Sequence, residues 1–254
     1  MPTVQDMSGQ VALVTGAGGS LGGASAVRIA ELGADVAILD VLGEALAGTA
    51  EKVRAMGRKV LELPLNLTDR AQCAAAVEQT VSHFGKIDAL CNIAGVLRCG
   101  RSEEVSEADW DIVIKVNLEA PFFLSRSAVP HMLKAGSGSI VNVCSTAAFK
   151  AQGFFSAYCA SKAGLLHLTK TMAVEYMKTP IRINAVAPGG MDTPLAGEAH
   201  PAFALDPEVV GRLGNPRGMC VIEDVADMVA YLASPASRSM QGSCVVVDTG
   251  EIVW

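Results

Sequence analysis

Short apolar runs alternate with stretches of helical periodicity along almost the whole chain. The runs predict strands over residues 10–15, 34–40, 58–63, 88–91, 140–144, 181–186 and 243–248. They are almost unbroken rather than alternating with polar residues, as expected where both faces of a sheet are covered. The segments between them predict helices over 21–32, 43–56, 70–84, about 103–134, 157–177 and 223–233. This order predicts an α/β fold, a doubly wound parallel sheet flanked by helices.

Nothing in the sequence divides the chain into parts. Composition does not shift along the 254 residues, no repeat is present, and half of the residues are hydrophobic, which allows a large core. We therefore expect a single domain over residues 1–254. Residues 194–220 are the least regular, with several Pro and Gly, and long irregular loops in compact domains are often lids or binding loops. We place a substrate loop at about 190–220.

Charge and cysteine usage narrow the classes of partner and compartment. The formal net charge is −6 and no basic run is present, which argues against nucleic acid as a partner. The seven cysteines form no CxxC pair, so free thiols and a reducing compartment are expected. The first residues lack a signal-peptide pattern, and no apolar run reaches the about 18 residues that a membrane span needs. The four histidines show no metal spacing, so we expect no metal. The expected free thiols and the lack of a signal peptide or membrane span together predict a cytoplasmic protein without membrane contact.

A glycine-rich turn joins the first predicted strand to the first predicted helix. Four glycines fall within residues 16–22: Gly16, Gly18, Gly19 and Gly22. Such a turn brings free backbone N–H groups and the positive end of a helix to one point, which suits a pyrophosphate. A tight turn without a ligand is the alternative, but four glycines are more than a turn needs. The pattern therefore favours a nucleotide site.

Asp40 ends the second predicted strand, 18 residues after Gly22. This is about where an acidic residue meets the adenosine ribose in dinucleotide sites. A carboxylate there repels a 2′-phosphate, and no Arg or Lys lies in the glycine turn or directly after Asp40. NAD is therefore favoured over NADP. The alternative is that Asp40 only caps the next helix.

Residues 138–164 carry the candidate chemistry. Ser145 lies at the carboxyl end of a predicted strand, where α/β sheets bind ligands. Tyr158 and Lys162 are four residues apart and share one face of the following helix. An ammonium one turn away is expected to favour the phenolate, and a nearby hydroxyl can hold a substrate oxygen, so the set suits proton exchange with an alcohol or carbonyl. A chance Tyr–Lys pair is the alternative. Asn117, within an apolar helical stretch, is either a core hydrogen-bonder or a site residue.

Taken together, these stretches resemble the short-chain dehydrogenase/reductase family, in its short single-domain subclass with a Rossmann-type sheet. The resemblance covers nearly the whole chain. The matching residues are Thr15-Gly16 to Gly22, Asn92-Ile93-Ala94-Gly95, Asn117, Ser145, Tyr158-x-x-x-Lys162 and Pro188-Gly189 with Thr193. Ser145 precedes Tyr158 by 13 residues, the usual spacing of the family.

The resemblance implies a role for each matching residue. Tyr158 would be the general acid/base, Lys162 would lower its pKa and hold the nicotinamide ribose, and Ser145 would orient the substrate oxygen. Asn117 would keep a water in a proton relay to Lys162, and Asn92 would support the central sheet. The implied cofactor-binding residues are Gly16, Gly19, Ser20, Leu21, Gly22, Asp40, Asn66, Leu67, Asn92, Ala94, Gly95, Tyr158, Lys162, Pro188, Gly189, Met191 and Thr193. Asn66 and Leu67 would flank the adenine, and Met191 and Thr193 would meet the nicotinamide carboxamide.

The sequence departs from the family pattern at two points. Ser20 stands where the family usually has Gly, and its hydroxyl could contact phosphate. Residues 248–250 read Asp-Thr-Gly where the family often has Asp-Gly-Gly, which would alter the C-terminal turn.

We expect an NAD-dependent oxidoreductase that interconverts a secondary alcohol and a ketone. The resemblance also implies a homotetramer. A non-catalytic NAD-binding sensor of the same fold is the alternative. An enoyl reductase is disfavoured, because that chemistry goes with a wider Tyr–Lys spacing.

Overall fold

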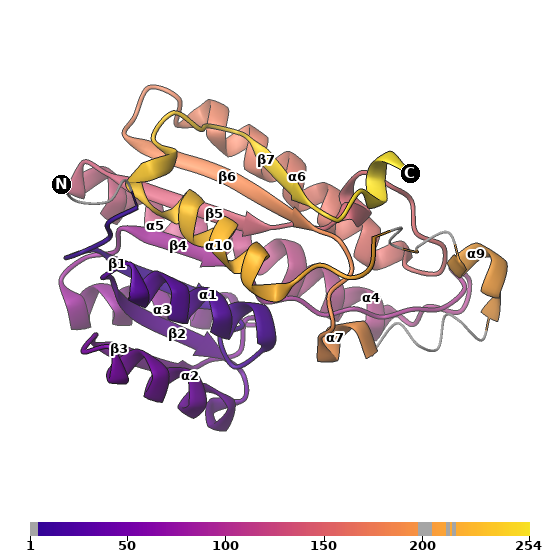
Figure 1. Cartoon of the computed structure of the whole chain (residues 1–254), viewed down its shortest axis with the longest axis horizontal. Helices are drawn as coiled ribbons and strands as arrows, with labels where there is room; N and C mark the ends of the chain where they lie inside the picture. Colours follow the sequence, from indigo (N-terminus) through magenta and orange to yellow (C-terminus); the bar gives the residue numbers. More distant parts are fainter. Residues whose placement is uncertain (1–4, 198–204, 212–213, 215–216) are drawn as a thin grey trace.

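The computed structural model describes residues 5–197, 205–211, 214 and 217–254. Its centre is one sheet with the strand order β3-β2-β1-β4-β5-β6-β7 (Figure 1). The strands are β1 (Val11–Thr15), β2 (Asp35–Asp40), β3 (Val60–Pro64), β4 (Ala89–Asn92), β5 (Gly138–Val143), β6 (Ile181–Pro188) and β7 (Cys244–Val247). All neighbouring strands are parallel, which confirms the predicted doubly wound α/β fold.

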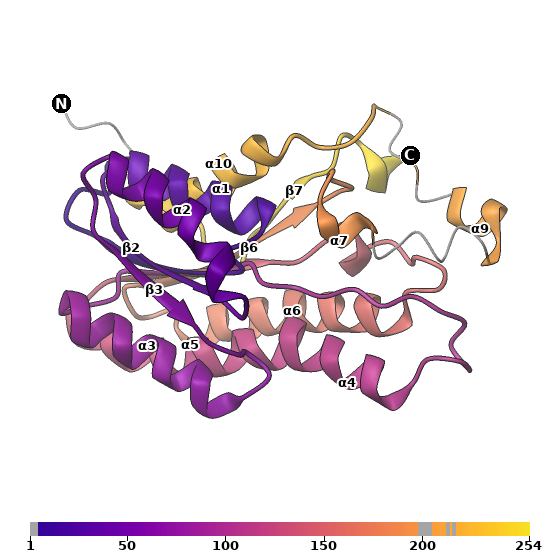
Figure 2. The same cartoon turned by 90° about the horizontal axis from the view of Figure 1, so that it is seen from below.

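Helices cover both faces of the sheet (Figure 2). One layer holds α1 (Ser20–Glu31), α2 (Gly43–Ala55) and α10 (Ile222–Ala233); the other holds α3 (Arg70–Phe84), α4 (Glu107–Ile114), α5 (Ala120–Ala135) and α6 (Ser156–Glu175). Successive side chains of β1 go to opposite layers: Val14 packs in the cluster that contains Ile29, and Leu13 in the cluster that contains Leu124. Full burial of such a side chain stabilises the fold by about 1.5–3 kcal/mol, so the unbroken apolar strands hold both layers in place.

The long helical region predicted over 103–134 begins later and is not uniform. Its first helix starts at Glu107, because the Ser106 hydroxyl accepts the Asp109 N–H at 3.0 Å and caps it there. A π-helical turn over Lys115–Glu119 then separates α4 from α5. Such widened turns are frequent at functional sites, and this one contains Asn117.

The predicted substrate loop contains two short helices. They are α7 (Pro194–Gly197) and α9 (Pro207–Gly211), while residues 198–204, 212–213 and 215–216 lie outside the described residues. Val209 of α9 packs on Gly153, where its Cγ1 lies 2.3 Å from the position that a Cβ would take. The loop that follows β5 and part of the 190–220 segment therefore face each other.

The strand order reverses between β1 and β4, and this reversal positions the candidate site. The chain runs outward from β1 to β3 and then crosses to β4 on the other side of β1. Such a switch point opens a crevice at the carboxyl ends of the strands. The Thr15 hydroxyl joins the two sides, accepting the N–H groups of Ile93 at 2.9 Å and Ala94 at 3.1 Å. The glycine turn after β1 is thereby held against the segment after β4.

A pair of glycine substitutions tests the packing of this turn. A Cβ on Gly22 would lie 2.1 Å from the Gly16 carbonyl oxygen, whereas one on the exposed Gly48 of α2 would meet nothing within 4 Å. We expect Gly22→Ala to destabilise the protein by at least about 2 kcal/mol, because backbone must move. Gly48→Ala should be neutral or stabilising by up to about 1 kcal/mol, from helix propensity. Urea unfolding of both variants measures the difference, and equal stabilities would contradict the close packing.

Candidate active site

Ser145, Tyr158 and Lys162 come together at the carboxyl end of β5. Ser145 lies two residues beyond this strand, and Tyr158 and Lys162 lie one turn apart near the start of α6. Lys162 Nζ lies 5.7 Å from the centroid of the Tyr158 ring and donates to the Val143 carbonyl at 2.9 Å. The Ser145 hydroxyl hydrogen-bonds with Tyr158 and accepts the Ala147 N–H at 3.1 Å. All three side chains are buried, so their interactions are poorly screened by water.

Burial shifts the pKa values of Tyr158 and Lys162. Burial raises the pKa of Tyr158 to about 12, and the hydrogen bond with Ser145 opposes that rise. Burial also lowers the pKa of Lys162 to about 8. Desolvation disfavours the phenolate and the ammonium alike, and it outweighs the hydrogen bond that favours the phenolate. The expectation that Lys162 lowers the pKa of Tyr158 stays a prediction.

Asn117 lies in the π-helical turn and is completely buried. Its Oδ1 accepts the Val96 N–H at 2.8 Å, and its Nδ2 donates to the Val96 carbonyl at 2.9 Å and to Ser161 Oγ at 3.2 Å. The side chain therefore fastens the segment after β4 to α6. A Cβ on Gly95 would be 3.5 Å from Asn117 Oδ1 and 3.6 Å from Lys162 Nζ, so these two groups border the same glycine. The water relay implied by resemblance stays a prediction.

The glycine turn and Asp40 contact each other directly. Helix α1 begins at Ser20 with Gly19 as its N-cap, one residue earlier than the pattern predicts. Asp40 Oδ2 accepts the Gly18 N–H at 3.1 Å, and Oδ1 accepts the Leu42 N–H at 3.1 Å. No side chain caps α2, so the capping alternative for Asp40 does not hold. The carboxylate lies beside the turn, where it would meet a ribose.

The neighbouring residues Asn66 and Leu67 follow β3. The Leu65 N–H donates to the Asp40 carbonyl at 3.2 Å, which places this segment beside the end of β2. Asn66 Oδ1 accepts the Thr68 N–H at 3.0 Å, and Leu67 is buried in the core. Their predicted contact with adenine remains an expectation of the resemblance.

A buried polar row lies under the ends of β4 and β5. Asn92 Nδ2 donates to Asn142 Oδ1 at 2.8 Å, and Asn142 Nδ2 donates to Thr169 Oγ1 of α6 at 2.9 Å. The row links two central strands to the helix that carries Tyr158. Asn142 was not identified from the sequence, and Thr15 was named only as part of a matching stretch, without a role. The signal for Asn142 is a single amide within the apolar run of residues 140–144.

The segment that follows β6 borders the candidate site at the same edge of the sheet. The Gly189 N–H donates to the Val247 carbonyl at 3.0 Å, just after Pro188 ends the strand. Met191 forms an isolated parallel bridge with Cys220, and the Thr193 carbonyl accepts the Ala196 N–H at 2.9 Å in the first turn of α7. These residues lie at the same edge of the sheet as the glycine turn, Ala94 and Gly95.

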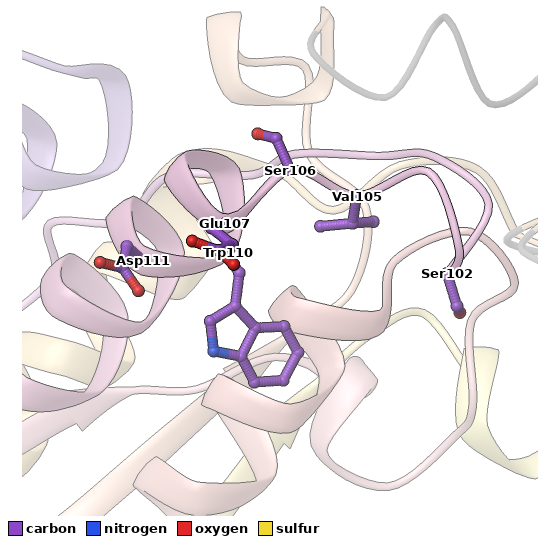
Figure 3. A pocket seen from close by; sticks show the side chains of 6 residues that line it. All are labelled: Ser102, Val105, Ser106, Glu107, Trp110 and Asp111. Atoms are coloured by element: carbon purple, nitrogen blue, oxygen red, sulfur yellow. The ribbon is translucent and has the colours of Figure 1, made fainter.

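A separate open cavity of about 300 Å³ lies at the start of α4 (Figure 3). Its lining residues are Ser102, Val105, Ser106, Glu107, Trp110 and Asp111. Neither the catalytic candidates nor the glycine turn line it. Within the described residues, no cluster of three or more His, Cys, Asp or Glu side chains could hold a metal ion, and no helix is long and apolar enough to cross a membrane.

The fold and the site define a dinucleotide-binding oxidoreductase of the doubly wound class. The chain belongs to the short-chain dehydrogenase/reductase family: the profile described as short chain dehydrogenase matches residues 10–202. It is 37% identical to the 3-oxoacyl-[acyl-carrier-protein] reductase of Thermotoga maritima, over 97% of this chain and 99% of that protein. It is 39% identical to the cyclohexanol dehydrogenase of Acinetobacter sp., over 94% of this chain and 93% of that protein.

A solved structure extends this likeness to three dimensions. The short chain dehydrogenase from Mycobacterium paratuberculosis bound to NAD superposes with a TM-score of 0.93 at 28% identity, over 98% of this chain and all of that chain.

The buried ammonium of Lys162 makes a testable contribution to stability. Below pH 8 the amine is protonated in the folded and unfolded chain, and the folded state carries the cost of burying charge. Between about pH 8 and 10.5 the folded state releases its proton first, so stability rises with pH. We expect Lys162→Met to be more stable than the wild type by about 1–3 kcal/mol below pH 8, with the gap closing toward pH 10.5.

Urea unfolding at a series of pH values measures this gap. Lys170→Met, at an exposed position of the same helix, is the matched control and should show no such dependence. A gap for Lys162→Met that does not change with pH would contradict the burial of a charged amine.

Proposed function

We propose that the protein is an NAD-dependent oxidoreductase that interconverts a secondary alcohol and a ketone. The observation that carries this proposal is the contact of Ser145 with Tyr158, one helical turn from Lys162, at the sheet edge that also holds the glycine turn. A hydroxyl, a phenol and an amine so arranged can hold a substrate oxygen and exchange a proton with it.

Each side chain has a distinct task in this proposal. NAD, when bound, supplies the hydride chemistry, and the protein supplies position and proton. Tyr158, with its high pKa, holds its proton at neutral pH and is suited to give it to a carbonyl oxygen. Ser145 holds that oxygen beside the phenol. Lys162 is fixed by Val143, so its remaining N–H groups are available to the ribose.

The carboxylate of Asp40 supports a preference for NAD over NADP. It lies against the Gly18 N–H, at the position expected for an adenosine ribose, and a 2′-phosphate there would meet a like charge. The residues proposed to hold the cofactor are those of the glycine turn, the Asn92–Gly95 segment and the Pro188–Thr193 segment. The similar Mycobacterium paratuberculosis protein is bound to NAD, which supports NAD as the cofactor.

The surroundings of Tyr158 support an apolar substrate. Tyr158 belongs to a hydrophobic cluster with Leu97, Ala147 and Phe155. Leu195 of α7 packs against this cluster. The relative named cyclohexanol dehydrogenase supports a secondary alcohol as the substrate class. We also propose a homotetramer, which light scattering of the purified protein would test.

The assignment of the acid/base predicts a separation of binding from turnover. Tyr158→Phe keeps the ring and removes the hydroxyl, so we expect NADH binding to persist while turnover of secondary alcohols falls by at least about 100-fold. Absorbance of NADH follows turnover, and fluorescence titration follows binding. Tyr176→Phe, at the end of the same helix, is the control and should resemble the wild type. Retained turnover in Tyr158→Phe would reject this base, and NAD binding without turnover in the wild type would favour the sensor.

The cofactor preference predicts a second change. Asp40→Asn keeps an oxygen for the Gly18 N–H but removes the charge, so the ratio of kcat/KM with NAD to that with NADP should fall by about tenfold or more. Glu51→Asn, at an exposed position of α2, is the control. An unchanged ratio would show that Asp40 does not select the cofactor.

A further inference from the structure

Glu251 is a buried carboxylate next to the candidate site, three residues from the end of the chain. Its side chain is 2% exposed, although it belongs to the short 3-10 turn Glu251–Val253 and the two residues after Ile252 are largely exposed. Acidic side chains are rarely buried unless they are well partnered.

The carboxylate joins two turns that border the site. Its Oε1 accepts Thr146 Oγ1 at 3.0 Å and Gln152 Nε2 at 3.4 Å, both from the turn that begins at Ser145. Its Oε2 lies against Gly189, 3.0 Å from the position of a Cβ, and the backbone of Gly190 interacts with the carboxylate in the sense that lowers its pKa. Any side chain at 189 would therefore push the carboxylate away.

The backbone around Glu251 holds it in this position. Asp248 Oδ1 accepts the Gly250 N–H at 2.9 Å, and Asp248 Oδ2 accepts the Ile252 N–H at 2.9 Å. Thr249 has a φ of 52°, and its hydroxyl donates to the Gly218 carbonyl at 2.7 Å. Lys150 Nζ donates to the Glu251 carbonyl at 3.3 Å. The altered C-terminal turn noted in the sequence thus directs an acid inward.

The two turns carry different parts of the proposed reaction. Ser145, which would orient the substrate oxygen, directly precedes Thr146. Gly190 directly precedes Met191, which would meet the nicotinamide. We propose that Glu251 is a positioning residue that aligns these two turns with each other through its two carboxylate oxygens. This inference rests on the function proposed above.

A carboxylate suits this position better than a neutral side chain. The partners at the two oxygens are hydroxyl, amide and backbone donors, and an ionised carboxyl accepts at both oxygens. A Gln amide has only one acceptor oxygen, and its NH₂ group is a donor. With Gln at this position, the donors of one turn would therefore face another donor instead of an acceptor. Burial raises the pKa of Glu251. The folded protein therefore becomes less stable as pH rises through that pKa and the buried carboxyl ionises. A charge kept at such a cost is consistent with selection for function rather than stability.

Glu251 also acts on Tyr158 through space. Its negative charge is one of the causes that raise the pKa of the phenol. The charged or titratable groups that face Glu251 are Lys150, Asp248, Cys220 and Tyr158. Removing the charge should therefore shift the pH dependence of alcohol oxidation. If Glu251 had a purely structural role, the pH dependence would not change.

Hydrogen exchange in Glu251→Gln tests the joining of the turns without any need for turnover. We expect peptides covering 144–153 and 188–193 to exchange at least about tenfold faster than in the wild type, and a peptide covering 20–31 to stay unchanged. Glu51→Gln, at an exposed position of α2, is the matched control. Thr146→Val removes one donor only and should accelerate the first peptide alone, which keeps the test valid if Glu251→Gln folds poorly. Unchanged exchange in both peptides would overturn the proposal.

Kinetics then test whether the alignment serves the reaction. We expect Glu251→Gln to lower kcat/KM for alcohol oxidation by about tenfold and to move its ascending limb to lower pH, because one charge that raises the pKa of Tyr158 is removed. Faster exchange with kinetics identical to the wild type would overturn the proposal. If the wild type oxidises no alcohol, the proposed function fails separately, and NADH titration decides: weaker binding in Glu251→Gln supports the alignment, and equal binding overturns it.

Discussion

The site depends on the removal of Tyr158 and Lys162 from water. Helix α6 packs so tightly against the end of β5 that the ammonium finds one protein acceptor, the Val143 carbonyl, and the phenol finds Ser145. Desolvation then sets both protonation states: it holds the proton on the phenol and weakens the hold on the amine. A group that keeps its proton in a dry site is well suited to donate it to a developing alkoxide.

The surrounding sheet provides the rigidity that such a site needs. Thr15 bonds the end of β1 to the segment after β4, and Asn92 and Asn142 bond β4 and β5 to α6. Each of these contacts joins elements that are distant in sequence. Buried polar rows of this kind specify one arrangement, because any shift of register leaves a donor or acceptor unpaired. The carboxyl edge of the sheet is thus a fixed frame for the glycine turn, the serine and the tyrosine.

Two further contacts join the described parts of the 190–220 segment to the rest of the chain. Helix α9 reaches the loop after β5 through Val209 and Gly153, and the C-terminal turn reaches the end of the 190–220 segment through Thr249 and Gly218. Glu251 lies buried where the turns that border the site meet.

Apolar runs and helical periods are local signals, so the sequence alone was sufficient for the fold class, a parallel sheet with helices on both faces. The spacing of Ser145, Tyr158 and Lys162 also indicated that these side chains lie close together, as they do at the end of β5. Tertiary structure decided the rest. The pKa of Tyr158 is raised, because burial outweighs the hydrogen bond with Ser145 that opposes the rise. The partners of Asn117, Asn142 and Glu251 come from distant segments, and no spacing along the chain encodes how deeply a polar group is buried or which backbone atoms it meets.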